Sequence, residues 1–343
     1  MADHNTSLPV VDVQANDSFH DLAIHYIGLF LKMYLTPALC FVGVFINLIN
    51  VVVFFKMGLS QGLTQNFFIL SLIDGITSAA NLVNAISYIM FNMPSMRGSS
   101  IDETLQDIMW VTLIIWAIIQ QWSLVTTLVI ALVRCCCVTM PLRVKQILTT
   151  RRQLYSIVGF SLLSEVMLVY GFASTERIRI IDPSTNLTLI AYVGKDYDKI
   201  DINVNVFQYT CYIIVTVCTI ILIISLNQSS KFRDQSSSAT GGTEKQKEKS
   251  KEVRIVQTVI LIATIFIIFN VPGLLLAVFR RVLPGFSGGG RLHKEHYFLI
   301  IVMESGVQIN AVVNIFIYLG YNSRYLSIVK EFLKLGKTSY SGT

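Results

Sequence analysis

Residues 114–141 read IIWAIIQQWSLVTTLVIALVRCCCVTMP, a long apolar run that closes on an arginine and a proline. An arginine at the centre of a bilayer costs roughly 2.5 to 3.5 kcal/mol on membrane-insertion scales. We therefore expect a membrane-spanning helix that places Arg134 at a membrane face, the cytoplasmic one. Taken alone, the stretch is explained more simply by an ordinary arginine that snorkels to water from a helix end.

The composition extends the membrane interpretation to the whole chain. Of 343 residues, 53% are hydrophobic and only 14% are charged, whereas soluble domains carry about 25% charged residues. The first twenty residues lack a basic segment followed by a short apolar core, so we expect the first span to act as its own signal anchor. The six cysteines show neither a disulfide framework nor a metal-ligand spacing.

The hydrophobic runs predict an all-α membrane protein, a bundle of seven transmembrane helices followed by a short amphipathic cytoplasmic helix. Each run has the length of about 20 residues or more that a spanning helix needs. The spans are expected at about 27–55, 65–91, 105–138, 154–172, 204–226, 253–279 and 297–319. The chain then divides into an N-terminal tail (1–25), a seven-helix domain (26–320), and a surface helix with a cytoplasmic tail (321–343).

Two segments expected on the cytoplasmic side have a distinctive composition or residue spacing. Residues 227–252 are rich in Ser, Gly, Lys and Glu, which predicts a flexible, solvated loop. After the seventh span, apolar residues recur at helical spacing among charged ones, which is typical of a helix lying along a membrane surface. These apolar residues are Tyr325, Ile328, Val329, Phe332 and Leu333.

The distribution of charge orients the chain. With the N-terminus outside, most of the 27 lysines and arginines lie on cytoplasmic segments, as the positive-inside rule requires. Glycosylation sequons at Asn5, Asn16 and Asn186 then fall in the extracellular tail and in the second outer loop. We expect a multi-pass protein of the plasma membrane with an extracellular N-terminus.

Asp74 is the strongest functional candidate among the ionisable residues inside the spans. Asn47, Ser123, Asn310 and Asn314 lie on other spans and could supply partners for its carboxylate. One carboxylate with neutral oxygens is suitable chemistry for a hard ion such as sodium. A polar network that only fastens the helices together explains the same residues equally well.

A second polar set lies nearer the outside. Trp116 and Gln120 are one helical turn apart, as are Glu304 and Gln308, and Asn270 precedes a proline in the sixth span. Together they could line an outward-facing pocket for a ligand, although hydrogen bonds between helices are the plainer alternative.

Five motifs occur in the expected order on the expected spans. They are Asn47; LSLID at 70–74; Arg134 with PL at 141–142; Phe266 with Pro272; and NIFIY from Asn314 to Tyr318. Together they resemble the rhodopsin-like, class A G-protein-coupled receptors. The run RCCC from Arg134, with PLRVK at 141–145 and VNIFIYL at 313–319, is similar to invertebrate receptors near the FMRFamide-peptide receptors, above all to molluscan chemosensory receptors.

The resemblance implies a receptor that senses an extracellular small molecule or peptide and activates a heterotrimeric G protein. In this family the sixth span swings outward about its proline, here Pro272, and the arginine and tyrosine at Arg134 and Tyr318 meet the G protein. Val133 replaces the usual acid beside the arginine, so we expect Glu252 to contact Arg134 in the inactive state. Asn270 replaces the usual sixth-span tryptophan.

The outer surface departs from the family as well. Met109 and Trp110 stand where the family has a cysteine, and the long second outer loop has none, so the family disulfide is absent and we expect a less fixed loop. Trp116 stands where amine receptors carry an aspartate, which disfavours a monoamine held by that pair. Glu304 could hold a cation, and a small neutral or amino-acid-like ligand fits no worse.

Other functional classes have less support. The seventh span, 297–319, contains no lysine that could carry retinal, so we expect no opsin and no organic cofactor. An ion path through Asp74, Glu165 and Glu304 is the main alternative, although Glu165 is expected to pack against a polar neighbour. No nucleophile–base pair suggests an enzyme, and the expected partners are a G protein, a ligand and the lipid membrane, with no nucleic acid.

Overall fold

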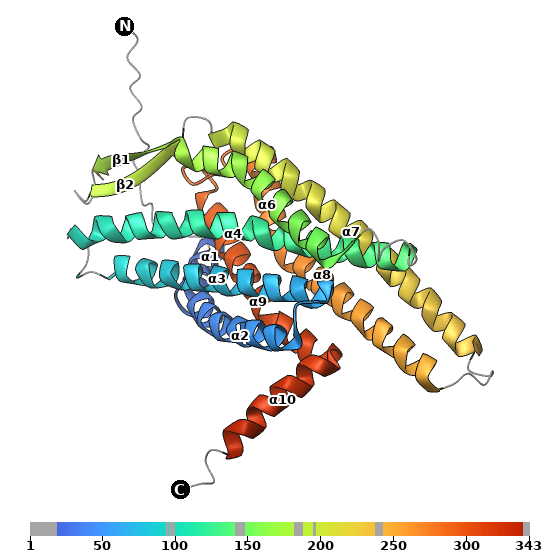
Figure 1. Ribbon diagram of the computed structural model, residues 1–343. Helices are drawn as coiled ribbons and strands as arrows, with labels where there is room; N and C mark the ends of the chain where they lie inside the picture. Colours follow the sequence, from blue (N-terminus) through green and yellow to red (C-terminus); the bar gives the residue numbers. More distant parts are fainter. Residues whose placement is uncertain are drawn as a thin grey trace.

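The structure is a computed structural model that describes the chain except residues 1–18, 94, 96–99, 141–147, 182–187, 195–196, 237–242 and 339–343. For 20, 100, 167, 181, 188–189, 191, 194, 197–203, 229–236, 243–252 and 333–338 the backbone is described without the side chains. Within the described part, seven segments are long and apolar enough to cross a membrane. They pack as a bundle (Figure 1), which confirms the expected fold.

The first span is assembled from three helical pieces, namely α1 (Phe19–Phe30), a π-helical turn η1 (Leu31–Leu35) and α2 (Thr36–Met57). The other spans are α3 (Gly62–Phe91), α4 (Ser100–Thr139), α6 (Thr150–Ala173), α7 (Tyr197–Ser236), α8 (Thr243–Val282) and α9 (His293–Tyr321). The chain then turns at Asn322 into α10 (Ser323–Thr338), which leaves the end of α9 at an angle (Figure 1).

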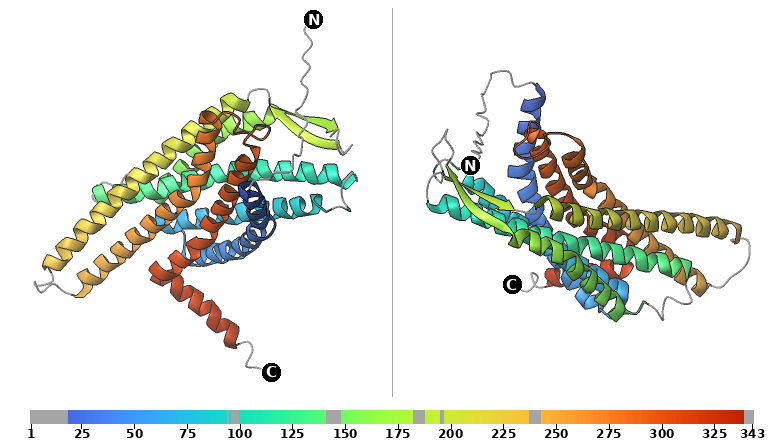
Figure 2. Two further views of the ribbon diagram at one scale, coloured as in Figure 1. Left: turned by 180° about the vertical axis from the view of Figure 1, so that it is seen from behind. Right: turned by 90° about the horizontal axis from the view of Figure 1, so that it is seen from above.

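The expected flexible loop at 227–252 is largely helical, and the prediction is corrected in this respect. Helix α7 continues to Ser236 and α8 begins at Thr243, and Figure 2 shows the two helices running side by side beyond the rest of the bundle. Glu, Lys and Gln are good helix formers. A helix already nucleated in the membrane extends into such a sequence without a new nucleation cost.

The long second outer loop contains a β-hairpin. Strand β1 (Thr175–Ile181) pairs antiparallel with β2 (Thr188–Gly194), with Thr175 opposite Gly194 and Ile181 opposite Thr188. The hairpin lies over the outer end of α4 (Figure 1).

An aromatic cluster closes the end of the core from which α10 begins. Phe54, Phe67, Tyr318 and Tyr325 come from α2, α3, α9 and α10, and each is at most 1% exposed. The Phe54 and Tyr318 ring centroids are 4.9 Å apart, and those of Phe54 and Tyr325 are 5.3 Å apart. The first pair is edge-to-face and the second is tilted. Aromatic pairs at such distances add about 0.5–1.5 kcal/mol each beyond the area that they bury, so the cluster ties four elements together.

A second part of the core joins α4, α7 and α8 through Leu124, Val215, Ala263 and Phe266. Helices α8 and α9 approach closely at Gly306, where an added Cβ would lie 2.7 Å from the backbone oxygen of Phe269.

Helix α10 is held by a chain of buried hydrogen bonds as well as by its apolar face. The Tyr325 hydroxyl donates to Asn50 Oδ1 at 2.5 Å, and Asn50 Nδ2 donates to Asn47 Oδ1 at 3.1 Å. Asn47 Nδ2 in turn donates to the backbone oxygen of Ala311 in α9 at 3.2 Å. These hydrogen bonds therefore couple the position of α10 to α2 and α9.

Replacing Tyr325 by Phe should destabilise the bundle, because the buried Asn50 oxygen would lose its donor. The expected loss is about 1–3 kcal/mol, the usual cost of an unsatisfied buried polar group. Thermal unfolding of the purified protein measures it, with Tyr321→Phe as the matched control because Tyr321 is 38% exposed. Equal melting temperatures for the two variants would contradict the role given to this hydroxyl.

Candidate functional site

The structure brings the predicted Asp74 cluster together at the centre of the bundle. Asn314 Nδ2 donates to Asp74 Oδ2 at 3.0 Å, and Ser123 Oγ lies 3.4 Å from Asp74 Oδ1. Asp74 is only 4% exposed. Asn47 belongs to the neighbouring chain of hydrogen bonds through Ala311 and does not bond Asp74 directly.

Two amide oxygens in this region have no hydrogen-bond donor among the described residues. They are Oδ1 of Asn310 and Oδ1 of Asn314, which are one turn apart on α9. Both residues belong to the set predicted to hold a cation with Asp74, and a carboxylate together with amide oxygens is the kind of donor set that hard cations prefer. In the described part of the chain, no group of three or more His, Cys, Asp or Glu residues suggests a site for a transition metal.

The predicted outer pocket is divided between two separate networks. In the first, Gln120 Nε2 lies 3.4 Å from Asn270 Oδ1, which also accepts from the Tyr212 hydroxyl at 3.0 Å. Asn270 Nδ2 donates to the backbone oxygen of Phe266 at 2.7 Å. This network joins α4, α7 and α8 two residues before Pro272, and Tyr212 is a member that the sequence analysis missed.

Gln308 belongs to the second network and is completely buried. Its Oε1 accepts from Ser78 Oγ at 3.0 Å, so it joins α9 to α3. Trp116 is half-buried, and its indole N–H has no partner among the described residues.

Glu304 is paired inside the protein, which corrects the expectation that it is available to hold a cation. Its Oε2 lies 2.5 Å from the Lys32 ammonium in η1, and the two side chains are 16% and 13% exposed. One turn along, Thr36 Oγ1 and Ser305 Oγ are 2.9 Å apart. The first and seventh spans are thus joined by one ion pair and one hydroxyl pair.

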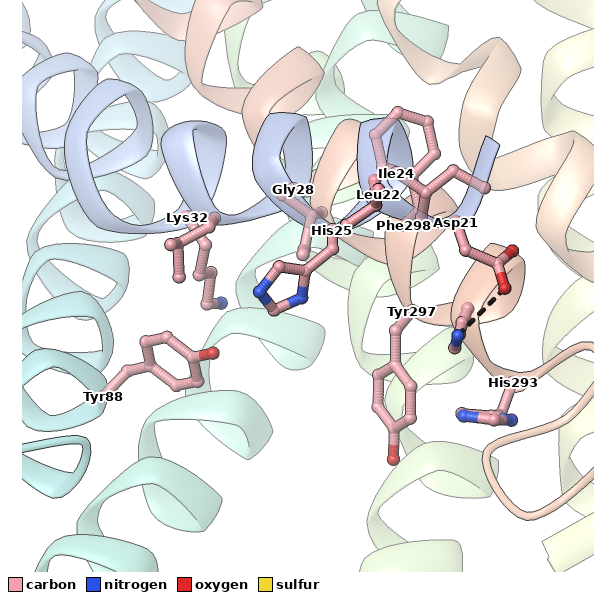
Figure 3. A pocket seen from close by; sticks show the side chains of 13 residues that line it. Asp21, Leu22, Ile24, His25, Gly28, Lys32, Tyr88, His293, Tyr297 and Phe298 are labelled. Carbon is pink, nitrogen blue, oxygen red and sulfur yellow. Dashed lines mark hydrogen bonds and ion pairs between the residues drawn. The ribbon is translucent and has the colours of Figure 1, made fainter. Parts of the chain in front are cut away.

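A cavity of about 470 Å³ opens beside this pair, between α1, η1, α3 and α9 (Figure 3). None of the five residues predicted for the ligand pocket lines it. Its polar lining comes from Asp21, His25, Lys32, Tyr88, His293, Lys294 and Tyr297. A lysine inside an otherwise apolar first span was the signal in the sequence that could have pointed here, because ionisable residues within spans are functional candidates.

The residues predicted for coupling do not form one cluster: Arg134 lies near the end of α4, whereas Phe266 and Pro272 flank Asn270 along α8. Arg134 is half-buried on α4, and its Nε atom makes no hydrogen bond with any described group. Phe266 is 1% exposed and packs on Tyr212 with ring centroids 5.6 Å apart. Pro272 lies inside α8. The side chain of Glu252 lies outside the described residues, and so does its expected contact with Arg134.

Glu165 has no polar neighbour in the described structure, contrary to expectation. It is 7% exposed, and neither carboxylate oxygen has a hydrogen-bond partner there. No described hydrogen bond joins Glu165, Asp74 and Glu304 into a path. The sequons Asn5, Asn16 and Asn186 lie outside the described residues.

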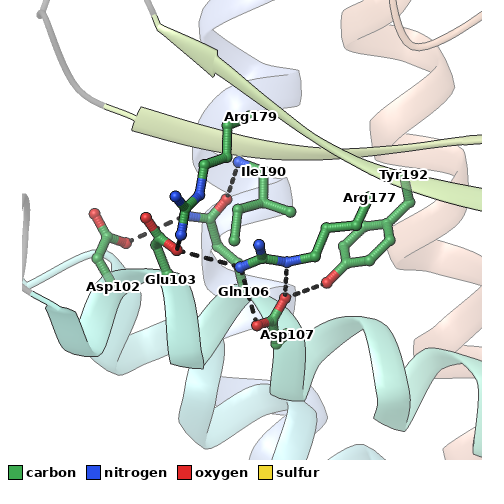
Figure 4. Close-up of polar contacts among 8 residues, drawn as sticks. All are labelled: Asp102, Glu103, Gln106, Asp107, Arg177, Arg179, Ile190 and Tyr192. Atoms are coloured by element: carbon green, nitrogen blue, oxygen red, sulfur yellow. Dashed lines mark hydrogen bonds and ion pairs between the residues drawn. The ribbon is translucent and has the colours of Figure 1, made fainter.

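The outer hairpin is joined to α4 by ion pairs and hydrogen bonds, and no disulfide is among its contacts. Arg177 bonds both Asp107 and Glu103, and Arg179 bonds Glu103 at 2.8 Å (Figure 4). The Tyr192 hydroxyl donates to Asp107, and burial together with this bond raises the pKa of the phenol. All six cysteines are free.

Ring stacking and a hydrogen bond to the backbone also hold the hairpin on α4. We call the whole set of contacts the outer clamp; its residues are Glu103, Gln106, Asp107 and Trp110 of α4 and Arg177, Arg179, Ile190 and Tyr192 of the hairpin. Trp110 is one of the two residues noted above as standing in place of a family cysteine. Its ring stacks flat on that of Tyr192, with centroids 4.3 Å apart and planes 5° from parallel. Gln106 Oε1 accepts from the backbone N–H of Ile190 at 2.9 Å. The clamp therefore uses both strands and about two turns of α4.

Comparison with known proteins is consistent with this geometry. The model of a family described as "Serpentine type 7TM GPCR chemoreceptor Srw" matches residues 34–336. Among solved structures, the crystal structure of squid rhodopsin is similar, with a TM-score of 0.64 and 16% sequence identity over 98% of this chain and 93% of that chain. No curated protein matches significantly.

Removing the central arginine of the outer clamp should loosen the hairpin. Because exposed ion pairs contribute little singly, we expect Arg177→Gln to speed amide exchange in β1 and β2 by about two- to fivefold. Hydrogen–deuterium exchange measures this, with Arg291→Gln in the third outer loop as the control. Unchanged exchange in Arg177→Gln would contradict the role given to this arginine in holding the hairpin.

Proposed function

The chain belongs to the Srw family of serpentine seven-transmembrane chemoreceptors, and we propose that it sits in the plasma membrane with its N-terminus outside and reports an extracellular chemical to a heterotrimeric G protein. As a rhodopsin-like G-protein-coupled receptor it needs a ligand site on one face of the membrane and a coupling site on the other. The outer cavity and the inner arginine are candidates for these two sites.

Arg134 carries the coupling part of the proposal. It lies near the inner end of α4, and its neighbour Val133 offers no charge. A buried guanidinium N–H without an acceptor is unfavourable, so the residue is suited to accept a partner that arrives from the cytoplasm. We assign that role to the G protein in the active state and to Glu252 in the inactive state.

The network around Asn270 supports a path from outside to inside. Pro272 has no N–H, so it cannot bond the carbonyl one turn earlier, and helices bend at such positions. Asn270 joins α8 to α4 and α7 just before this weak point. A ligand that favours one arrangement of these helices shifts the receptor only by its difference in affinity for the two states.

A small molecule fits the outer cavity better than a long peptide does. Its volume of about 470 Å³ lies within the usual 300–1,000 Å³ of small-molecule sites. Retinal is not proposed as a ligand. Lys294 begins the first turn of α9, but it is paired with Asp21 at 3.0 Å, and residues 297–319 contain no lysine.

Replacing Arg134 by Ala should abolish ligand-stimulated nucleotide exchange while surface expression stays intact. The assay is G-protein activation in cells given a panel of amines, amino acids, carboxylates, odorants and amidated peptides, with Arg291→Ala as the control. In the same assay Glu252→Ala should raise basal exchange. A response that survives in Arg134→Ala would contradict the coupling role, and ligand-gated current without a G protein would favour an ion path.

We further propose that Asp74 with Ser123, Asn310 and Asn314 holds a sodium ion. Because a ligand that binds the folded state stabilises it, sodium should raise the melting temperature relative to choline at equal ionic strength. Asp74→Asn should remove the difference, and Glu165→Gln, which alters another buried carboxyl, should keep it. A sodium effect that persists in Asp74→Asn would place the ion elsewhere.

A further inference from the structure

We propose that the outer cavity between α1, α3 and α9 binds a small organic carboxylate, with the Lys32 ammonium as its charge partner. The inference rests on the proposed receptor function and names the class of ligand. It stands on the charges that line the cavity, on the position of Lys32, and on the aromatic walls.

Lys32 is the charged residue of the cavity lining whose carboxylate partner lies outside that lining. Asp21 and Lys294 face each other at one end, with Lys294 Nζ 3.0 Å from Asp21 Oδ2 (Figure 3). Lys32 lies at the other end, and the imidazoles of His25 and His293 add two further nitrogen-bearing groups. Among the described residues no second carboxylate lines the cavity, so the lining favours an anion.

The Lys32 ammonium is placed where it can donate hydrogen bonds to two acceptors. Its ammonium bonds Glu304, which is not among the residues that line the cavity, and lies 5.5 Å from the centroid of the Tyr88 ring. An ammonium has three donors, so a ligand carboxylate can share Lys32 with Glu304 or replace it. The residue sits in a π-helical turn, and such turns are frequent at functional sites.

A cationic ligand fits this site less well. Glu304 does not line the cavity, and its charge is already matched by Lys32 at 2.5 Å. Asp21 is already engaged by Lys294. An amine in the cavity would therefore meet the Lys32 ammonium before it met an available carboxylate.

The rest of the cavity suits an apolar or aryl portion of the ligand. Tyr88 and Tyr297 stand on opposite sides with His25 between them (Figure 3). Phe298 and Ile301 add apolar surface from α9. An apolar wall with one placed charge is the usual construction of a site for a small amphiphilic molecule.

Binding at this site would act on the packing of the receptor. The Lys32–Glu304 pair joins the first span to the seventh, and α9 also carries Asn314 and Tyr318 toward the cytoplasmic end. A carboxylate that draws Lys32 away from Glu304 weakens this link at its outer end. The ligand thus has a direct means of favouring one arrangement of α9 over another.

The test is direct binding to the purified full-length receptor, measured as a shift in melting temperature without G protein. The probes are hexanoate, decanoate and phenylacetate, each beside the amine of matching size. We expect the acids to stabilise the receptor and the amines not to. Lys32→Gln should weaken acid binding about ten- to hundredfold, because hydrogen bonds between charged groups are the strong ones. Glu304→Gln should tighten acid binding.

Matched variants keep the result interpretable. Lys32→Gln leaves Glu304 without its partner, so the double variant Lys32→Gln/Glu304→Gln, which is neutral at both positions, supplies a folded receptor that should also fail to bind acids. Arg291→Gln should bind acids as the original receptor does. Absence of acid binding, acid binding that is unchanged in the double variant, or amine binding that is lost in Glu304→Gln would each overturn the inference.

The outcome is separable from that of the proposed function. Acid binding without nucleotide exchange would count against the receptor function as proposed while leaving the site in place. Nucleotide exchange driven by other ligands, with no acid binding, would overturn the carboxylate site alone.

Discussion

Every polar group that this bundle buries must find its partner inside the protein, because the hydrocarbon around it offers none. The helices are arranged accordingly. The Asp74 carboxylate accepts from α4 and α9, Asn270 joins α4, α7 and α8, and Lys32 joins the first span to the seventh through Glu304. These contacts set the register of helices whose apolar surfaces alone would pack in several ways.

Some buried polar atoms make no hydrogen bond with any described group, and three of them belong to residues for which a partner is proposed. They are the Arg134 Nε atom, on the residue proposed to meet the G protein, and Oδ1 of Asn310 and of Asn314, on two residues of the proposed sodium site. Glu165 is unpartnered in the same sense, and the structure offers no account of its role.

The outer face solves a different problem, because it is in water and its ion pairs are exposed. Single exposed pairs contribute little, and the clamp on the hairpin combines two arginines, two acids and a flat stack of Trp110 on Tyr192. A network of this kind can open and re-form, whereas a disulfide cannot under oxidising conditions. The hairpin is thus joined to α4 by contacts that can break and re-form.

The sequence by itself determined the seven spans, their order and the Asp74 cluster, because hydropathy and residue spacing are local properties that one helix carries alone. It also singled out Asn270, Gln120 and Gln308 as polar positions. Only the tertiary structure decided which polar residues meet. Gln308 bonds Ser78, Glu304 pairs with Lys32, and the cavity lies beside the first span. The helical extension of α7 and α8 and the clamped hairpin were missed as well. Rotations of whole helices and contacts across distant segments set these features, and no local pattern encodes them.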